Sequence, residues 1–401
     1  MQTQSDNLSR VLRIPGYHVV DCEVNEAEIH LRIERDERQY RCPKCKQLLL
    51  WYYDCRDRTV QDLPAFGQKV FLTFTQYRLR CPCSGKVVTE ELDFVEPRQH
   101  QTCRFQQAIY FWLKTGTTTK KAAKAFGLSW DQVRHIDERL IRQEQENESY
   151  DDLRRLCVDE KAIGRGHDYI TIVSDLDKGR VVFVAEGRKK SSLDKFYRHI
   201  GSERASRIEL ITMDMWGPYI QSTKEHAPQA DIVFDKFHIL RQLNAKIDAL
   251  RRQLQKRKEA AGYKVVKRSR WVLLKANENL TESQRYTLSK IAEDNEELYK
   301  AYLLREQFRA LFVPTELKLA LDRLADWMRE VYESGLKPMI KFVQQCGRWF
   351  EGLVNYFKHG VTNALSEALN SKIALMLKLS NGIGNRDYFL MKIYQQCGDL
   401  H

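Results

Sequence analysis

Residues 156–159 read Leu-Cys-Val-Asp, and this short apolar run ending in Asp159 decides the fold of the second half of the chain. The segments around it predict strands over residues 169–173, 181–184, 208–214 and 231–235, and helices over residues 191–200 and 218–226. A polar turn at residues 175–179 joins the second and third strands. The order β-β-β-α-β-α-β predicts an α/β core in which the first and fourth strands each end in an aspartate, Asp159 and Asp214.

Two aspartates at the ends of neighbouring strands would lie side by side at one edge of the sheet. Like charges at that distance are costly unless a cation neutralises them, and Mg²⁺ is the divalent ion that carboxylates usually hold next to phosphates. A third acid, Glu367, falls on a helix expected over residues 363–379, where Asn363, Glu367 and Asn370 share one polar stripe. Each acid alone reads most simply as an ordinary surface carboxylate. Their order along the chain is the layout of a ribonuclease-H-like core for phosphoryl transfer by two metal ions.

Residues 236–357 carry helical periodicity and no strand pattern, which predicts an all-helical insertion into this core. Residues 251–270 hold nine Lys or Arg against one acid, Glu259. Taken alone, this run reads as a solvated helix face, but the same density of positive charge neutralises DNA phosphates. The expected DNA contacts are Arg251, Arg252, Lys256, Arg257, Lys258, Lys267, Arg268 and Arg270. Trp271, at the end of the run, is interpreted as a core residue in preference to a stacking platform for an unpaired base.

The first hundred residues predict a β-rich segment that contains two close cysteine pairs. Cys42 and Cys45 have a spacing that bends around one zinc ion, and Cys81 and Cys83 supply a tighter second pair. Cys55 or Cys103 could replace a member of the second pair, and buried free cysteines are the alternative to a zinc site. The remaining cysteines are scattered, so we expect a reducing compartment and no disulfide framework.

Residues 119–129 place a glycine between two short amphipathic segments, which predicts a helix-turn-helix with Ser129 capping the second helix. The side chains near the exposed start of that helix are Trp130, Gln132, Arg134 and His135, and these would read the major groove of double-stranded DNA. A helical hairpin packed on the core is the alternative.

The charge of the whole chain favours a polyanionic partner. Lys plus Arg outnumber Asp plus Glu by 66 to 54, a formal net charge of +12 over 401 residues. No apolar run reaches the roughly 18 residues that a membrane span requires, and residues 1–13 lack the layout of a signal peptide. We therefore expect no membrane partner and a place in the cytoplasm, with the bacterial nucleoid.

Several motifs resemble those of the ISL3 family of bacterial insertion-sequence transposases. They lie at residues 158–162, 166–169, 213–219, 234–238 and 363–370, and the resemblance runs from about residue 40 to the end. It implies a zinc-binding segment, a helix-turn-helix and a catalytic domain of the DDE type, in which Asp159, Asp214 and Glu367 match the three acids. Asp235 and His238 resemble an element that supports the active site in several DDE transposases.

The chain departs from the family pattern at two places. Where the family usually carries glycines around the glutamate, this chain has Ala364 and Ala368. Where the family tends to show Cys-Pro-x-Cys-Gly, it reads Cys-Pro-Cys-Ser-Gly, so that Ser84 occupies the expected ligand position.

With this resemblance, we expect a multidomain α+β transposase that binds the terminal inverted repeats of its element, cuts the element ends and joins a 3′-hydroxyl to target DNA. Two Mg²⁺ (or Mn²⁺) ions per active site, a structural Zn²⁺ and a homodimer or larger synaptic assembly are expected with it. The expected domains are residues 1–100 (β-rich, zinc-binding), 101–150 (helix-turn-helix), 151–240 (ribonuclease-H-like core, first part), 241–355 (helical insertion) and 356–401 (closing helices). A structure-selective nuclease and a zinc-dependent DNA-binding regulator without catalysis are the alternatives.

Overall fold

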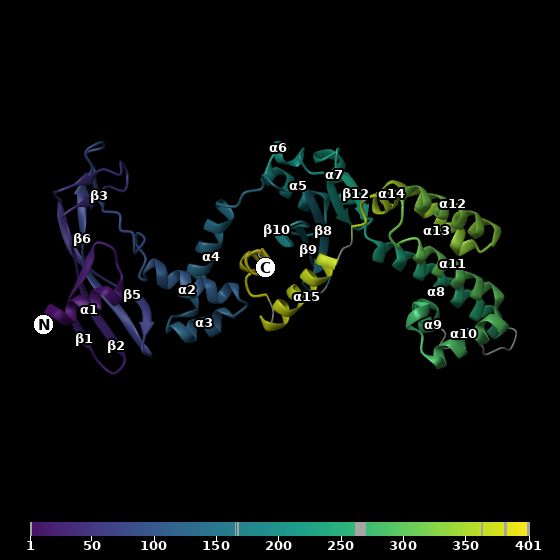
Figure 1. The fold of residues 1–401 in the computed structure, drawn as a ribbon, viewed down its shortest axis with the longest axis horizontal. Coiled ribbons are helices and arrows are strands. Elements are labelled where there is room, and N and C mark those ends of the chain that lie inside the picture. The colour runs from purple at the N-terminus through teal and green to yellow at the C-terminus, as the bar shows by residue number, and fades with distance from the viewer. Residues whose placement is uncertain are drawn as a thin grey trace. The chain divides into compact units, whose positions relative to one another are not determined.

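The computed structural model describes residues 2–164, 166, 168–260, 270–361, 364–380 and 383–398. The chain forms two compact units, Met1–Glu148 and Ser149–His401 (Figure 1). Each unit has its own sheet and its own hydrophobic core. Over the described ranges, no helix combines the length and the apolar character needed to cross a bilayer.

The first unit is built on the β-rich segment that the sequence predicts. Its five-stranded sheet has the order β1-β2-β6-β5, with β7 paired to β6. The strands are β1 (Tyr17–Val24), β2 (Glu28–Arg35), β5 (Asp54–Ala65), β6 (Gln68–Arg80) and β7 (Val87–Thr89). In β6, Val70, Leu72 and Phe74 are buried while the residues between them are not, because successive strand residues face opposite sides of a sheet. Helix α1 (Gln2–Leu12) packs against β1.

Three helices complete the first unit: α2 (Cys103–Lys114), α3 (Thr119–Phe126) and α4 (Trp130–Glu146). Helix α3 ends at Gly127, whose φ of 64° is left-handed, a conformation that glycine adopts without steric cost. Ser129 then caps α4 by accepting a hydrogen bond from the Gln132 amide. The predicted helix-turn-helix is therefore present as two packed helices with a glycine turn between them.

The second unit is built on a mixed sheet of order β10-β9-β8-β11-β12. The strands are β8 (Arg155–Ala162), β9 (Tyr169–Asp175), β10 (Arg180–Glu186), β11 (Leu210–Met213) and β12 (Asp231–Phe234). Strand β9 is antiparallel to both of its neighbours, whereas β8, β11 and β12 run parallel. Consequently β8, β10, β11 and β12 all point the same way, and their carboxyl ends meet at one edge. This confirms the predicted order of strands and helices.

Helices cover both faces of this sheet. Helices α5 (Lys190–Ile200) and α7 (Gly217–His226) bury Leu193, Phe196 and Tyr219 on one face, and the short α6 (Ser202–Ala205) follows α5. Helices α15 (Ala364–Leu379) and α16 (Arg386–Cys397) bury Leu369 and Ile393 on the other. The last helices of the chain thus pack on a sheet whose first strand begins more than 200 residues earlier.

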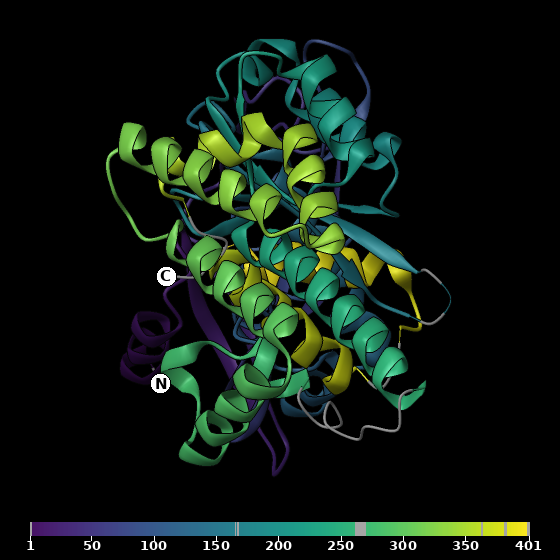
Figure 2. The same ribbon diagram turned by 90° about the vertical axis from the view of Figure 1, so that its right-hand side faces the viewer.

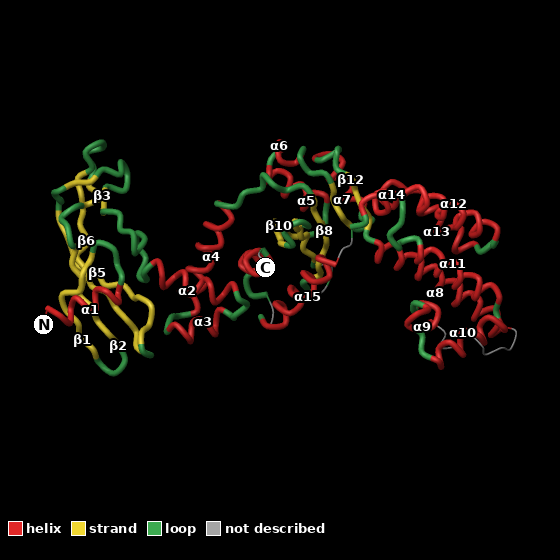
Figure 3. Tube along the Cα trace, in the orientation of Figure 1, coloured by secondary structure: helices red, strands yellow, loops and turns green. Residues whose placement is uncertain are grey.

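Between β12 and α15 the described chain consists of helices joined by loops and turns, with no strand, as Figure 3 shows. The helices are α8 (Lys236–Ala260), α9 (Arg270–Leu274), a 3₁₀ turn (Asn277–Asn279), α10 (Glu282–Asp294), α11 (Glu296–Ala310), α12 (Leu317–Glu333), α13 (Lys337–Arg348) and α14 (Phe350–His359). Helices α11 and α13 both pack against α8, and these long helices can be followed side by side in Figure 2. Leu243, Phe308 and Phe342 of these helices belong to the same hydrophobic cluster as the sheet residues Val158 and Val233. The insertion and the sheet therefore share one core.

Candidate functional site

The first two predicted acids lie at the same level on neighbouring strands. Val158 of β8 pairs with Met213 of β11 in parallel register, so Asp159 and Asp214 are the next residues on each strand. Burial raises the pKa of Asp214, and the negative charge of Asp159 raises it further. The two carboxylates therefore lie close enough to influence each other's charge.

One detail of that prediction is wrong. Asp159 does not end its strand, because β8 continues to Ala162 through antiparallel pairing with β9. Strand β11 ends one residue before Asp214. The acid pair thus combines a residue held inside a strand with one at the start of a loop.

Helix α15 is fixed directly onto Asp159. Ser366 Oγ and Asn370 Nδ2 both donate hydrogen bonds to Asp159 Oδ2, the latter at 2.5 Å. The other carboxylate oxygen, Oδ1, accepts the Glu160 backbone amide at 2.7 Å. The chain segment that carries the third acid is therefore docked on the first acid.

Glu367 lies between these two contacts on α15. At about 100° per residue, Glu367 is rotated about 60° from Asn370 and about 100° from Ser366 around the helix. Its side chain is exposed, and in the described part of the chain its carboxylate makes no hydrogen bond or ion pair. The structure therefore brings Asp159 and Asp214 together and places Glu367 on the adjoining helix with a free carboxylate.

Ser366 is a site residue that sequence reasoning missed. The polar stripe predicted from the sequence runs through Asn363, Glu367 and Asn370, whereas the stripe that contacts Asp159 runs through Ser366 and Asn370. Asn363 itself lies outside the described residues. The spacing of four residues between Ser366 and Asn370 was the available signal, since it puts two small polar side chains on one face of an otherwise apolar helix.

His238 joins Asp214 to a third aspartate. Asp235 follows β12 and accepts the Phe237 amide through Oδ1 at 2.9 Å, which caps the start of α8. His238 Nδ1 lies 2.6 Å from Asp214 Oδ1 and 3.0 Å from Asp235 Oδ2. The hydrogen bond to Asp214 and then that to Asp235 raise the pKa of His238 to about 10, so the imidazole is positively charged at neutral pH.

The donor set of this edge fits a hard divalent cation. Carboxylate oxygens of Asp214 and Asp235 lie within 4.8 Å of one another, and Asp159 adds a carboxylate at the same level. Asn370 Oδ1 is buried and has no hydrogen-bond partner among the described residues. A buried acceptor left unpaired is costly, and a water molecule bound to a metal ion on Asp159 would satisfy it.

The cysteines of the first unit come together as the sequence predicts. Sulfur atoms of Cys42, Cys45 and Cys81 lie within 4.8 Å of one another, and Cys83 Sγ is 3.0 Å from Cys81 Sγ. The hydrogen bond between these two side chains lowers the pKa of Cys81 to about 6 and raises the pKa of Cys83 to about 11, so Cys81 is the thiolate of the pair. Cys55, on β5, is not part of the cluster described here.

The two cysteine loops have the same backbone design. The Lys46 amide donates to the Cys42 carbonyl and the Gly85 amide donates to the Cys81 carbonyl, and both donors have left-handed φ angles of 58° and 64°. The first loop leads from β3 (Tyr40–Arg41) to β4 (Leu48–Leu49). Ser84 therefore occupies the position in the second loop that Cys45 occupies in the first. Cys103, the other proposed substitute ligand, begins α2 and is not in the cluster described here.

The predicted base-reading residues of α4 have different surroundings. Trp130 is 44% exposed and His135 is exposed as well. Gln132 Oε1 accepts the Ser129 amide at 2.9 Å, so this side chain belongs to the helix cap. Arg134 forms an ion pair with Glu138 at 2.7 Å and lies over the Trp130 ring.

The basic run is partly neutralised inside the insertion. Asp248 forms ion pairs with Arg251 (2.9 Å), Arg252 (2.5 Å) and Arg270 (3.7 Å). Lys256 and Arg257 are exposed on α8. The side chain of Lys258, and Lys267 and Arg268, lie outside the described residues.

The interpretation of Trp271 as a core residue is wrong. Its side chain is 69% exposed, and the Arg270 guanidinium lies 5.3 Å from its ring centroid. The physical reason is the shortness of α9, which buries only Val272 and Leu273 and leaves the preceding residue on the solvent side.

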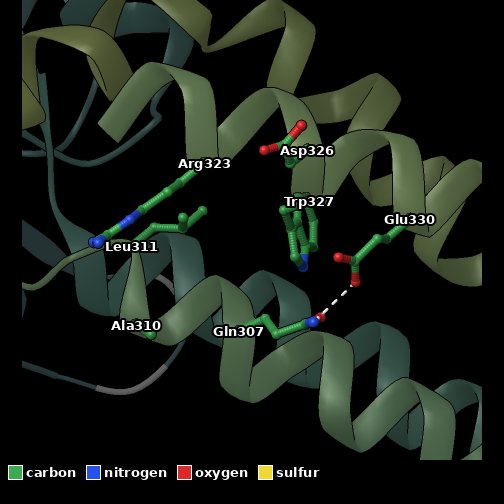
Figure 4. Close-up of a pocket in the computed structure, with 7 residues that line it drawn as sticks. All are labelled: Gln307, Ala310, Leu311, Arg323, Asp326, Trp327 and Glu330. Carbon is green, nitrogen blue, oxygen red and sulfur yellow. Dashed lines mark hydrogen bonds between the residues drawn. The ribbon is translucent and has the colours of Figure 1, made fainter. Parts of the chain in front are cut away.

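A surface cavity of about 280 Å³ lies between α11 and α12 (Figure 4). Gln307 donates to Glu330 at 2.9 Å across it, and Arg323 and Asp326 line its other side. None of the acids discussed above lines this cavity, so it is separate from the candidate active site.

Comparison with known proteins gives one consistent result. A family model described as "Transposase", of the ISL3 DDE type, matches residues 156–393, and one described as "Helix-turn-helix domain of transposase family ISL3" matches residues 90–141. The chain is 27% identical over 355 residues to "Transposase for insertion sequence element IS1001" of Bordetella parapertussis, covering 88% of this chain and 87% of that protein. It is also 27% identical over 369 residues to "Transposase for insertion sequence element IS1557" of Mycobacterium tuberculosis, covering 85% and 82%.

Proposed function

The chain belongs to the ISL3 family of insertion-sequence transposases, a DDE family of catalytic proteins, and from that premise we propose its reaction. It binds the terminal inverted repeats of its own element, cuts the DNA at the element ends, and joins a free 3′-hydroxyl to target DNA. The proposal rests on one observation: Asp159 and Asp214 lie at the same level on neighbouring strands, and α15 is hydrogen-bonded to Asp159.

The ribonuclease-H-like core that the resemblance implies is supported by the second unit. Its mixed sheet carries the first acid on β8 and the second after β11, which are neighbours in the sheet. The helical insertion shares a core with that sheet, and α15 returns to it with the third acid. Contacts that close a loop of 207 residues, as that between Ser366 and Asp159 does, indicate a site assembled by the fold as a whole.

Asp159, Asp214 and Glu367 would hold two Mg²⁺ or Mn²⁺ ions. When bound, such ions lower the pKa of the attacking water or hydroxyl and stabilise the leaving 3′-oxygen. Ser366 and Asn370 both donate hydrogen bonds to Oδ2 of Asp159, whereas Oδ1 accepts only the Glu160 backbone amide among the described residues and is the less constrained oxygen. This arrangement orients the carboxylate before DNA arrives, and preorganised charge is what phosphoryl transfer requires.

Asp235 and His238 act as positioning residues in this proposal. The positively charged imidazole lies between Asp214 and Asp235 and reduces the repulsion between them. Because Asp235 also caps α8, the position of His238 is tied to the start of the insertion. Asp214 is therefore held by an element that also orients the helices beside the site.

The first unit would bind and recognise DNA. The sulfur cluster of Cys42, Cys45, Cys81 and Cys83 would hold a structural zinc ion, and α4 would enter the major groove with Trp130 and His135 exposed. Two element ends must be cut together, so two copies of the chain would act in one assembly on double-stranded DNA.

One experiment separates this function from its alternatives. Purified protein is incubated with Mg²⁺ or Mn²⁺, duplexes carrying the DNA that flanks its coding region, and a plasmid target. We expect cleaved ends and joined products from the wild type, and neither from Asp159→Asn, which should still bind DNA. Cleavage without joined products would indicate a nuclease, and an Asp159→Asn variant identical to wild type in every assay would indicate a regulator without catalysis.

A further inference from the structure

Two exposed aromatic side chains follow the acids at the carboxyl edge of the second sheet. Trp216 stands two residues after Asp214 and is 36% exposed, and Phe237 stands two residues after Asp235 and is 47% exposed. Strands β11 and β12 pair in parallel register through their last residues, so the two aspartates are level and the two aromatic residues follow at matching positions. Large aromatic rings exposed to solvent beside the acids of the proposed active site indicate a ligand that covers them.

Each of these rings lies under a positive charge. The Arg188 guanidinium carbon is 4.9 Å from the centroid of Trp216, and Lys236 Nζ is 5.3 Å from the centroid of Phe237. An aromatic face with an adjacent cation is the combination by which proteins hold unpaired nucleotides, because the ring stacks on the base and the cation attracts the phosphate.

Trp216 is held in one orientation before any ligand arrives. Its indole Nε1 donates to the Arg188 carbonyl at 2.9 Å. The Arg188 guanidinium is stacked between Tyr169, at 4.1 Å, and Trp216, and its Nη1 lies 3.2 Å from Glu160 Oε1. Fixing the ring in advance reduces the entropy lost when a base stacks on it.

We propose that the pairs Arg188–Trp216 and Lys236–Phe237 hold DNA nucleotides, unstacked from the duplex, beside the scissile phosphate. This inference rests on the proposed function, since the nucleotides are those next to the bond that the acids cut. The energy of stacking on the protein offsets the few kcal/mol that unstacking a base from DNA costs. Base identity matters little to such a contact, because every base has a face that stacks.

The test pairs a protein change with a DNA change. Trp216→Ala and wild type are compared on intact end duplexes and on a series in which one nucleotide at a time near the cleavage site is abasic. On intact DNA we expect wild type to cut roughly 5- to 150-fold faster than Trp216→Ala. On the duplex that lacks the stacked base, the ratio should fall to about one, because neither protein has a base to stack.

The controls separate stacking from a folding defect. Trp216→Phe keeps an aromatic face and should retain most of the activity, while Phe350→Ala, at a residue of α14 that is 47% exposed like Phe237, should behave as wild type. Melting curves check that the variants fold. The inference is overturned if the ratio is the same at every abasic position or if Trp216→Phe is as impaired as Trp216→Ala. Dissociation constants for the same DNA series are measured in parallel, and the ratio between Trp216→Ala and wild type is compared at each abasic position in the same way. A wild type that binds but does not cut would therefore overturn the proposed function alone.

Discussion

A side chain at Gly352 should destabilise the fold, although alanine normally favours a helix. A Cβ at this position of α14 would lie 2.3, 2.5 and 2.8 Å from three ring carbons of Phe234, the last residue of β12. Ordinary carbon–carbon contacts are about 3.5–4.0 Å, so the ring would have to retreat by about 1 Å or more. Phe234 is 5% exposed and packs in the main core cluster, so that the ring cannot move freely into solvent.

The expected magnitude follows from two opposing contributions. Overpacking a core costs about 1–3 kcal/mol, and replacing glycine by alanine in a helix returns about 0.5–1 kcal/mol. Gly352→Ala should therefore lower the free energy of unfolding by about 1–2 kcal/mol. Gly347→Ala on α13 is the matched control, because its Cβ would meet nothing within 4 Å, and it should raise the unfolding free energy by about 0.5–1 kcal/mol.

The assay is urea unfolding of the full chain, followed by circular dichroism, with the midpoint and slope compared between the two variants. The midpoint should fall for Gly352→Ala and rise for Gly347→Ala, with the slope unchanged. If both variants move in the same direction by the same amount, the close packing of α14 on β12 is refuted.

Three further predictions concern the charges, the metal ligands and the cysteines. The pKa of His238 is raised from 6.5 to about 10, so its ion pairs stabilise the fold fully below pH 6.5 and lose that effect as the pH rises through 10. In urea unfolding in the presence of EDTA, the difference in unfolding free energy between wild type and His238→Gln should shrink across that pH window. A difference that stays constant with pH would contradict a stabilising role for these ion pairs. Asn370→Leu removes a donor to Asp159 and the unpaired acceptor beside it, so the Mg²⁺ concentration for half-maximal cleavage should rise by about 10- to 100-fold, whereas an unchanged Mg²⁺ dependence would exclude Asn370 from the metal site. Purified protein should contain one zinc ion per chain by elemental analysis, which Cys42→Ala loses and Cys55→Ser keeps; equal zinc content in both variants would place the ion elsewhere.

Much of the second unit could be predicted from the sequence because its elements are locally encoded. Short apolar runs bounded by turns gave the strand order, and an aspartate directly after such a run indicated where Asp214 would lie. Asp159 was located less accurately, since the length of β8 depends on its pairing with β9, and a pairing partner is not visible in the strand's own residues.

The contacts of the candidate site were harder to predict because they depend on tertiary structure. The hydrogen bond from Ser366 to Asp159 joins residues 207 positions apart, and the polar face that Ser366 and Asn370 share does not by itself reveal which distant residue it contacts. The sequence favours a core position for Trp271, but a helix of five residues has too little surface to bury every large side chain. Gln132 reads as a base-contacting residue until the capping geometry of Ser129 is known.

The docking of α15 on β8 has a consequence for the timing of synthesis. Chains emerge from the ribosome at about 5–20 residues per second, so some 10–40 s separate the appearance of Asp159 from that of Ser366. During that interval the nascent protein already carries its helix-turn-helix and lacks the helix that bears Glu367. On the proposed function, unfinished chains are harmless to the chromosome, and a prematurely terminated product that ends before α15 would compete for element ends without cutting them.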